Sequence, residues 1–221
     1  MHVFVTGATG WVGSAVVDEL LTAGHTVTGL VRTSDKAAAL AQKGAGVLIG
    51  TLDDHDALQS AARAAEAVIH TAFHHDFSRF QESAAWDQRA IEAMGAALVG
   101  TGKPILVTTG LSGLPRGASE DDRPNPAAPR RSEAAARTLI ERGVRAGIVR
   151  LAPSVHGIGD YGFVPMVAGF ARRNAAGFGL SSSLAPRGRP ERPVVMRIGL
   201  PVPTRAAPMA SIARWSWAAL S

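Results

Sequence analysis

The chain has 221 residues, of which 46% are hydrophobic and 19% are charged. These values predict a soluble globular protein with one sizeable domain, or one domain plus an appendage, and they exclude disorder throughout. Because cysteine is absent, disulfide scaffolds, thiolate metal sites and catalytic thiols are excluded as well.

The net positive charge lies near the C-terminus. Residues 1–173 contain 17 Lys and Arg against 17 Asp and Glu, whereas residues 174–221 contain six Arg and one acid. A basic excess confined to a tail does not indicate a nucleic-acid-binding fold. We expect no nucleic acid partner, because the alternative, RNA binding by the tail, lacks aromatic platforms for the bases.

The first residues, Met1–Val5, carry no basic segment, and nowhere do eighteen apolar residues run together. A secretory signal and a membrane-spanning helix are therefore not expected. We predict a cytoplasmic protein without a membrane partner.

Short β-branched runs alternate with helical patterns over residues 1–173. Six mostly apolar runs without period-two alternation predict buried parallel strands: His2–Thr6, Thr26–Val31, Gly46–Ile49, Ala67–Thr71, Pro104–Thr109 and Arg145–Leu151. This alternation predicts the α/β class, with a doubly wound parallel sheet and helices on both of its faces.

Three helices are predicted between these strands, over residues 11–23, 76–100 and 131–142. In the first, apolar spacing predicts an inward stripe of Val12, Val16, Leu20 and Ala23, and in the last it predicts an inward face of Ala135, Leu139 and Ile140. Gly24 and Gly143 follow the first and last helices, where a terminating glycine is common.

The segment Thr6–Gly13 reads TGATGWVG and lies directly between the first strand and the first helix. Gly7 allows a tight turn, Gly10 lets the backbone approach a diphosphate, and Gly13 lets the helix pack close to the strand. The predicted dinucleotide site therefore contains Gly7, Thr9, Gly10, Trp11, Val12 and Gly13. An ordinary glycine turn is the alternative.

The Gly-x-x-Gly-x-x-Gly spacing resembles that of the extended and atypical short-chain dehydrogenase/reductase superfamily, which includes NAD-dependent epimerases and dehydratases. Ala67–Phe73, Ile105–Thr109 and Val149–Gly157 also match stretches of that superfamily. The resemblance covers residues 1–173. It implies a Rossmann-like fold, a nicotinamide cofactor and a small-molecule substrate.

Arg32 follows the second strand, where NAD-binding proteins carry an acid that accepts hydrogen bonds from the ribose. An arginine beside Thr33 and Ser34 instead favours a 2′-phosphate. We therefore expect NADP(H) as the preferred cofactor, with NAD as the alternative. A solvated arginine that opens a loop is the other interpretation.

The resemblance implies further contacts with the cofactor. Leu52 and Asp53 match a segment that lies against the adenine, although Asp53 or Asp54 capping the next helix is an equal alternative. Thr71, Ala72 and Phe73 match the turn beneath the nicotinamide ribose, and Thr108 is assigned to the cofactor site.

The catalytic Tyr and Lys pair of active members of the superfamily is missing. The single tyrosine, Tyr161, precedes Pro165 by four residues, and all three lysines lie before residue 104. At the expected place, residues 129–134 read PRRSEA, and arginine does not give up its proton in a protein. Ordinary acid–base chemistry is therefore not expected from this pair.

A hydroxyl after the fifth strand holds the substrate oxygen in that superfamily. Thr109 is the first candidate here and Ser112 the second. The alternative is that Thr109 is an ordinary β-branched strand residue and that Ser112 belongs to a turn. His74 or His75 is a candidate general acid. We expect no metal site, because adjacent histidines point apart and no ligand spacing completes a set with His70.

His74, His156 and Phe163 are the predicted substrate residues, and Tyr161 lies near the last two in the sequence. His156 and Phe163 follow the sixth strand on the edge where ligands bind in open α/β sheets. Aromatic packing within a loop is the alternative interpretation.

The resemblance stops near Arg173, so the predicted domains are 1–173 and an irregular Pro- and Arg-rich tail at 174–221. Val194–Ile198 and Ile212–Leu220 are its candidate strand and helix. The composition is typical of a truncated or out-of-frame C-terminus, with a genuine insertion or linker as the alternative. An uncovered sheet edge predicts an aggregation-prone protein or a homodimer.

Two functions remain open after the sequence is considered. The first is an oxidoreductase that transfers hydride between NADP(H) and a small carbonyl or alcohol. The second is a non-catalytic sensor that binds NADP(H), which the missing Tyr and Lys pair favours.

Overall fold

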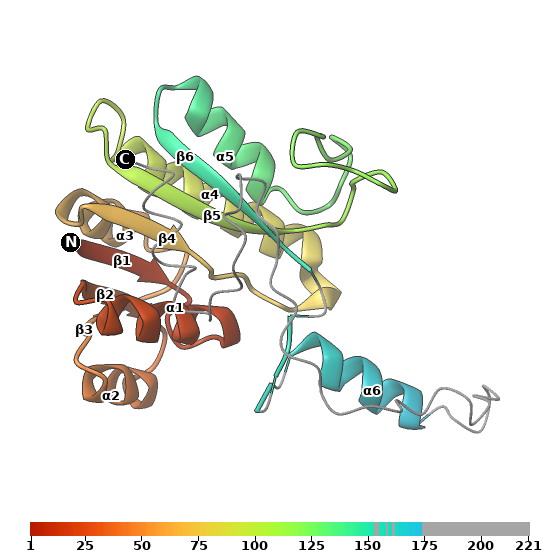
Figure 1. Cartoon of the computed structure of the whole chain (residues 1–221), viewed down its shortest axis with the longest axis horizontal. Coiled ribbons are helices and arrows are strands. Elements are labelled where there is room, and N and C mark those ends of the chain that lie inside the picture. Colours follow the sequence, from red (N-terminus) through yellow and green to blue (C-terminus); the bar gives the residue numbers. More distant parts are fainter. Residues whose placement is uncertain (153–154, 158, 161, 174–221) are drawn as a thin grey trace, which may run out of the picture.

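A computed structural model describes residues 1–152, 155–157, 159–160 and 162–173. Within them, six strands form one parallel sheet in the order β3-β2-β1-β4-β5-β6 (Figure 1). The strands are β1 (His2–Thr6), β2 (Thr26–Val31), β3 (Gly46–Ile49), β4 (Ala67–His70), β5 (Pro104–Gly110) and β6 (Arg145–Leu151). The predicted doubly wound α/β fold is confirmed.

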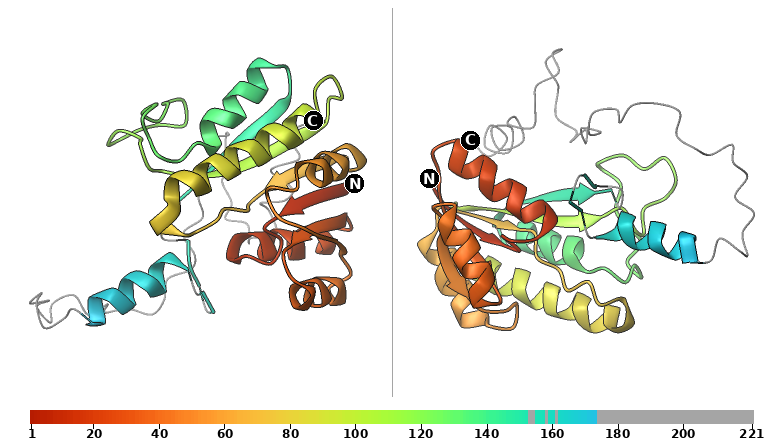
Figure 2. Two further views of the ribbon diagram at one scale, coloured as in Figure 1. Left: turned by 180° about the vertical axis from the view of Figure 1, so that it is seen from behind. Right: turned by 90° about the horizontal axis from the view of Figure 1, so that it is seen from below.

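Helices cover both faces of this sheet (Figure 2). They are α1 (Trp11–Thr22), α2 (Ser34–Gln42), α3 (His55–Ala64), α4 (Phe80–Ala96), α5 (Ser132–Glu141) and α6 (Phe163–Arg173), with a 3-10 turn η1 (Phe77–Arg79) before α4. In Figure 1, α6 projects beyond the carboxyl ends of the strands. None of the helices in the described stretches is long and apolar enough to cross a membrane.

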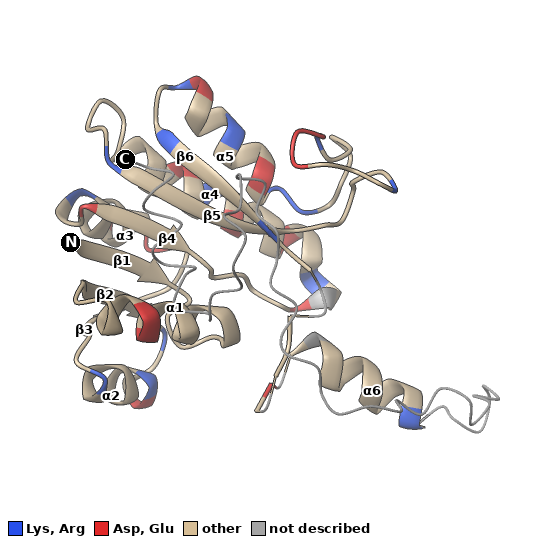
Figure 3. Cartoon of the chain, in the orientation of Figure 1, with Lys and Arg blue, Asp and Glu red and all other residues tan. Residues whose placement is uncertain are grey.

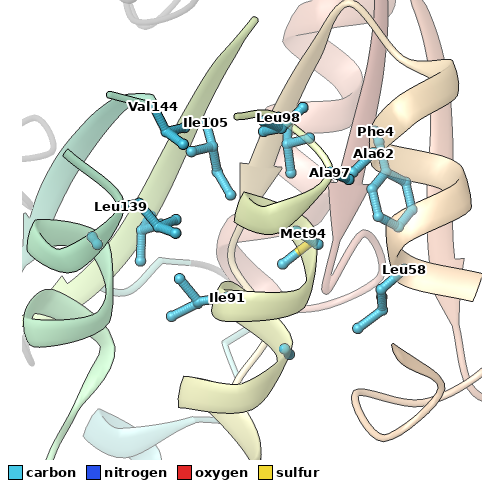
Figure 4. Packing of buried hydrophobic residues seen from close by; sticks show 14 of the residues in the cluster. Phe4, Leu58, Ala62, Ile91, Met94, Ala97, Leu98, Ile105, Leu139 and Val144 are labelled. Atoms are coloured by element: carbon cyan, nitrogen blue, oxygen red, sulfur yellow. The ribbon is translucent and has the colours of Figure 1, made fainter. Parts of the chain in front are cut away.

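Successive residues of β1 point to opposite faces and so build two separate cores. Val3 and Val5 pack with residues of α1 and α2, including Val17 and Leu40. Phe4 packs on the other face with α3, α4 and α5, where Figure 4 shows Leu58, Ile91, Met94 and Leu139 converging. The crossovers between strands thus place two helices on one face and three on the other.

Three details of the predicted helices are wrong. The buried residues of α1 are Gly13, Val17 and Leu20, so that Leu20 of the predicted stripe is buried and Val16 packs partly buried against the core, whereas Ala23 is exposed beyond the helix end. Ile140 on α5 is 46% exposed, because the helix turns that position away from the sheet. The long helix predicted over 76–100 is shorter, since η1 precedes α4 and the chain leaves the helix after Ala96.

The predicted irregular tail, with its candidate strand Val194–Ile198 and helix Ile212–Leu220, lies outside the described residues. Tyr161 lies outside them as well.

Candidate functional site

The site lies where the strand order reverses. β1 pairs with β2 on one side and with β4 on the other, and the chain crosses to opposite faces from these two strands. In open α/β sheets this arrangement leaves a crevice at the carboxyl ends of the two central strands. Here those ends are Thr6 and His70, which stand opposite each other in register.

The glycine loop after β1 has no space for side chains at two positions. Gly7 has φ +66°, and its backbone carbonyl accepts a hydrogen bond from the Gly10 amide at 2.8 Å. A Cβ at Gly13 would lie 2.0 Å from the Gly7 carbonyl oxygen and 2.6 Å from Thr71 Oγ1. The predicted roles of Gly7 in the turn and of Gly13 in close packing agree with this geometry.

The first turn of α1 presents backbone donors. Gly10 is the N-cap residue, no side chain caps the helix, and the first turn contains no acid. The first helical hydrogen bond runs from the Ser14 amide to the Gly10 carbonyl, so the amides of residues 11–13 have no partner within the helix. Together with the helix dipole, these amides favour a bound anion.

The turn after β4 closes one side of the glycine loop. Thr71 Oγ1 donates to the Thr6 carbonyl at 2.7 Å, and the Ala72 amide donates to Thr6 Oγ1 at 3.3 Å. A Cβ at Gly7 would lie 2.7 Å from the Ala72 nitrogen. The structure therefore brings together the glycine motif and the Thr71–Phe73 turn, which the sequence assigned to one site from distant segments.

A buried polar chain runs from this turn into the core. Thr6 Oγ1 lies 2.8 Å from His70 Nδ1, and His70 Nε2 lies 2.8 Å from Asp87 Oδ1. Ser132 Oγ donates to the other oxygen of Asp87. All four side chains are buried without exposed surface.

The sequence interpretation did not identify Asp87 and Ser132 as members of this series of buried hydrogen bonds. The one signal for Asp87 was an acid among the apolar positions of the helix predicted over 76–100. Both ring nitrogens of His70 are engaged, and in the described part of the chain no group of three or more His, Cys, Asp or Glu side chains is placed to hold a metal ion.

Phe73 is the centre of a cluster of aromatic and cationic side chains. The Arg130 guanidinium lies 4.0 Å from the centre of the Phe73 ring. The rings of His75 and Phe80 lie 5.3 and 5.6 Å from it. Burial and then the charge of Arg130 lower the pKa of His75 below the ordinary value of 6.5.

His74 points to a different neighbour. Its ring lies 5.7 Å from Trp86 in an edge-on arrangement. Its Nδ1 is buried and has no hydrogen-bond partner among the described residues. An unpaired buried nitrogen is costly in a folded protein, so His74 has a polar atom available to a ligand.

The predicted adenosine residues lie at the ends of β2 and β3. Arg32 is exposed directly after β2. Leu52 is partly buried, and Asp53 is exposed, 3.9 Å from Arg89. Asp54 is the N-cap residue of α3 by position, but its side chain does not cap the helix. The carboxylate instead accepts hydrogen bonds from the amide and hydroxyl of Thr51.

The predicted hydroxyls after β5 differ in their surroundings. Thr108 Oγ1 donates to the His70 carbonyl at 3.0 Å, which ties β5 to β4. Thr109 is buried at 5% exposure near the end of the strand, and Ser112 is exposed in the following turn. His156 is exposed after β6, and Phe163 begins α6. Their catalytic and substrate roles remain predictions.

Comparison with known proteins supports this arrangement. A protein family described as NAD(P)H-binding matches residues 7–159. Two uncharacterised yeast proteins are similar in sequence. The protein from Schizosaccharomyces pombe is 45% identical over 177 residues, and that from Saccharomyces cerevisiae is 40% identical over 182. In both cases the match covers 78% of this chain and 60% of the relative.

Solved structures share the fold. UDP-glucose 4-epimerase from Thermus thermophilus, in complex with NAD, has a TM-score of 0.63 at 23% identity, over 80% of this chain and 64% of that chain. Yeast methylglyoxal/isovaleraldehyde reductase Gre2, in complex with NADPH, has a TM-score of 0.53 at 20% identity, over 68% and 56% of the two chains. The family match covers more than half of the sequence, and the chain therefore belongs to the NAD(P)H-binding family and has the fold of the short-chain dehydrogenase/reductase and epimerase superfamily.

Proposed function

We propose that this protein binds NADP(H) across the carboxyl ends of β1 and β4 and transfers hydride between the cofactor and a small carbonyl or alcohol substrate. The observation that carries the proposal is the uncapped first turn of α1, whose amides at residues 11–13 lie beside a glycine turn without side chains. A diphosphate fits these residues because the donors converge and no acid repels it.

The preference for the 2′-phosphate is supported by Arg32. It is exposed at the end of β2, and none of the hydrogen bonds or ion pairs among described residues includes it. A free guanidinium binds a phosphate through charge-assisted hydrogen bonds, whereas it gives no such advantage to a ribose hydroxyl.

When bound, the nicotinamide supplies or accepts a hydride at the substrate carbon. The chain must then provide or receive one proton at the substrate oxygen. The lowered pKa of His75 leaves its ring mostly unprotonated near pH 7, so it holds little of the proton that the substrate oxygen needs. His74 is the favoured candidate because its buried Nδ1 has no hydrogen-bond partner among the described residues. Thr109 supports the same step as a hydroxyl that holds the substrate oxygen.

The second candidate function is a sensor that binds NADP(H) without turnover. It is favoured by one observation, the absence of a tyrosine four residues before a lysine anywhere in the sequence. Turnover separates the two functions. Oxidation of NADPH with any member of a panel of small aldehydes and ketones, abolished by changing both His74 and His75 to Gln, supports the enzyme. Binding with no oxidation supports the sensor.

Cofactor binding is tested by NADPH fluorescence with the substitution Gly10→Asp. Aspartate favours the N-cap position, so the thermal stability of the variant is expected to stay equal or rise. Its carboxylate takes the amides of α1 and repels a diphosphate, so affinity should fall at least about tenfold. Unchanged NADPH affinity in a folded Gly10→Asp protein would contradict this site.

The phosphate preference is tested separately with Arg32→Asp. We expect the ratio of NADPH to NADH affinity to fall by about tenfold or more, since a favourable charge becomes an unfavourable one. Lys36→Asp is the matched control, because Lys36 is an exposed cation on the adjoining helix α2. Equal losses in the two variants would show a general charge effect and no specific contact.

A further inference from the structure

Arg130 occupies the place just before α5 where members of the superfamily carry the start of their Tyr and Lys helix. Its guanidinium lies over the Phe73 ring, 4.0 Å from the ring centre, and its Nε donates to Ser132 Oγ at 3.0 Å. The side chain is half-buried. None of the ion pairs between described residues includes Arg130.

A series of buried hydrogen bonds fixes the orientation of this guanidinium. Ser132, which accepts from Arg130, donates to Asp87, and Asp87 is held by His70. These three partners are buried without exposed surface, so their side chains have little freedom to move. The two terminal nitrogens of Arg130 make no hydrogen bond to any described residue and remain as donors.

Arg130 also lies beside the predicted nucleotide site. Phe73 follows Ala72, and the Ala72 nitrogen lies so close to Gly7 that a Cβ there would be 2.7 Å from it. The sequence interpretation places the turn at residues 71–73 beneath the nicotinamide ribose. A cation over Phe73 is therefore at the nicotinamide end, away from the adenosine end marked by Arg32. Figure 3 shows basic residues in the segment that leads into α5.

We infer that Arg130 is an anion-binding residue, which holds a carboxylate or phosphate oxygen of a ligand next to Phe73. The inference rests on the proposed function for the position of the cofactor. A fixed fork of N–H donors on an aromatic face suits a planar carboxylate, and the rings of Phe73 and Phe80 provide apolar surface for the rest of the ligand. The substrate class is accordingly an acidic carbonyl compound or an acidic alcohol.

The same chemistry has a second source, because the cofactor itself carries a diphosphate. The two sources differ in what Arg130 changes. If the anion belongs to the substrate, substitution of Arg130 alters the binding of small acids and leaves NADPH affinity unchanged. If the anion belongs to the cofactor, substitution of Arg130 lowers NADPH affinity and leaves the binding of small acids unchanged.

The test uses benzoate and benzamide, which have nearly the same shape but differ in charge. Their affinities are measured by calorimetric titration into the full chain, with and without saturating NADPH. We expect benzoate to bind at least about tenfold more tightly than benzamide, since a charge-assisted bidentate contact exceeds a neutral one. The difference should shrink at high salt as the half-buried charge is screened.

Two variants localise the effect. Arg130→Met retains a long apolar side chain over Phe73 and should abolish the preference for benzoate. Arg131→Gln is the matched control, because Arg131 is the adjacent exposed arginine, and it should retain the preference. Arg130→Lys, with its charge but no fork, should retain part of it.

The outcomes separate the proposals. A wild-type protein that binds benzoate and benzamide equally, with NADPH affinity unchanged in Arg130→Met, overturns the anion-binding role. A loss of NADPH affinity in Arg130→Met without a loss in Arg131→Gln supports the role and assigns the anion to the cofactor. Failure of NADPH to bind the wild-type protein overturns the proposed function, whereas the benzoate preference is still measured on the free protein.

Discussion

Asp87 places a carboxylate without exposed surface between a histidine and a serine. His70 Nε2 lies 2.8 Å from one of its oxygens, and Ser132 donates to the other. Asp87 lies on α4 and its partners lie on β4 and α5, so one residue joins three elements beneath the candidate site. Buried polar groups are tolerated only when they are paired, and here each member has a partner.

Replacement of Asp87 by alanine is therefore expected to be strongly destabilising. It leaves His70 Nε2 and the hydroxyl hydrogen of Ser132 without a partner in the core, which should lower the free energy of unfolding by about 3 kcal/mol or more. Urea denaturation followed by circular dichroism measures this change.

Ser83→Ala is the matched control on the same helix. Ser83 is buried, and its Oγ has no hydrogen-bond partner among the described residues. Removing an unpaired hydroxyl should leave stability equal or slightly raised. Similar losses in both variants would show that α4 is sensitive to any change at a buried position, and the network would then have no special role.

Sequence patterns predict residues with special backbone needs better than they predict buried polar pairs. Gly7, Gly24 and Gly143 have positive φ values, as expected from their positions at a turn and at helix ends. Asp87 and Ser132 gave no comparable signal, because an acid or a serine on an amphipathic helix is usually solvated. Their partners are set by packing between segments that lie 45 residues apart.

At the scale of elements, Glu133 ties α5 to the end of the sheet. Its carboxylate accepts from Arg137 on the same helix and from Arg150 on β6, with closest distances of 2.8 Å. Arg150 also donates to the backbone carbonyls of Ser119, Glu120 and Asp122. One arginine thus holds the loop that leads from β5 to α5 against the sheet.

This contact predicts a loss of stability in acid. Burial raises the pKa of Glu133, but the hydrogen bonds from Arg150 and Arg137 outweigh it and leave the pKa below its ordinary value of 4.5. A lowered pKa means that the stabilisation is present above about pH 4.5 and is lost as the pH falls through the folded value. Glu133→Gln should therefore be less stable than the wild type at pH 7 and should lose less stability on acidification.

Urea denaturation at pH 7, 5 and 4 checks this expectation. Glu141→Gln is the control, since Glu141 is exposed near the end of the same helix. Parallel acid profiles for the wild type and Glu133→Gln would contradict it.

The strands were the elements most accurately predicted. Apolar runs bounded by turns predicted both ends of four of the six strands correctly, and the predicted ends of β4 and β5 are each one residue away from those in the structure. Helix registers were less accurate, because the fully buried residues of α1 are Gly13, Val17 and Leu20, whereas the predicted Val16 is only partly buried against the same core. Gly13 faces inward at a place where a Cβ would lie 2.0 Å from the Gly7 carbonyl oxygen, and apolar periodicity carries no information about such a contact.

At the scale of the molecule, the two faces of the sheet are covered unequally. α1 and α2 pack on β1, β2 and β3, whereas α5 packs on β5 and β6 from the opposite face. Ile148 of β6 packs on the α5 side of the sheet. Val149, the next residue of the strand, therefore points to the opposite face. Among the described elements, no helix packs on the Val149 side of β6, and β6 has one neighbouring strand.

β6 is thus an edge strand of the described sheet with an apolar face on which no described helix packs, and such a strand favours pairing with a second copy of the chain. We predict that the protein self-associates at micromolar concentrations, and that Val149→Lys shifts it toward the monomer, because a charge at this partly buried position opposes stacking of two sheets. Val99→Lys is the control, since Val99 is 42% exposed in the connection between α4 and β5 and lies away from this edge. Sedimentation velocity over a hundredfold range of concentration gives the result. A wild-type protein that stays monomeric throughout, or one whose association responds equally to the two lysines, would show that β6 is not the contact.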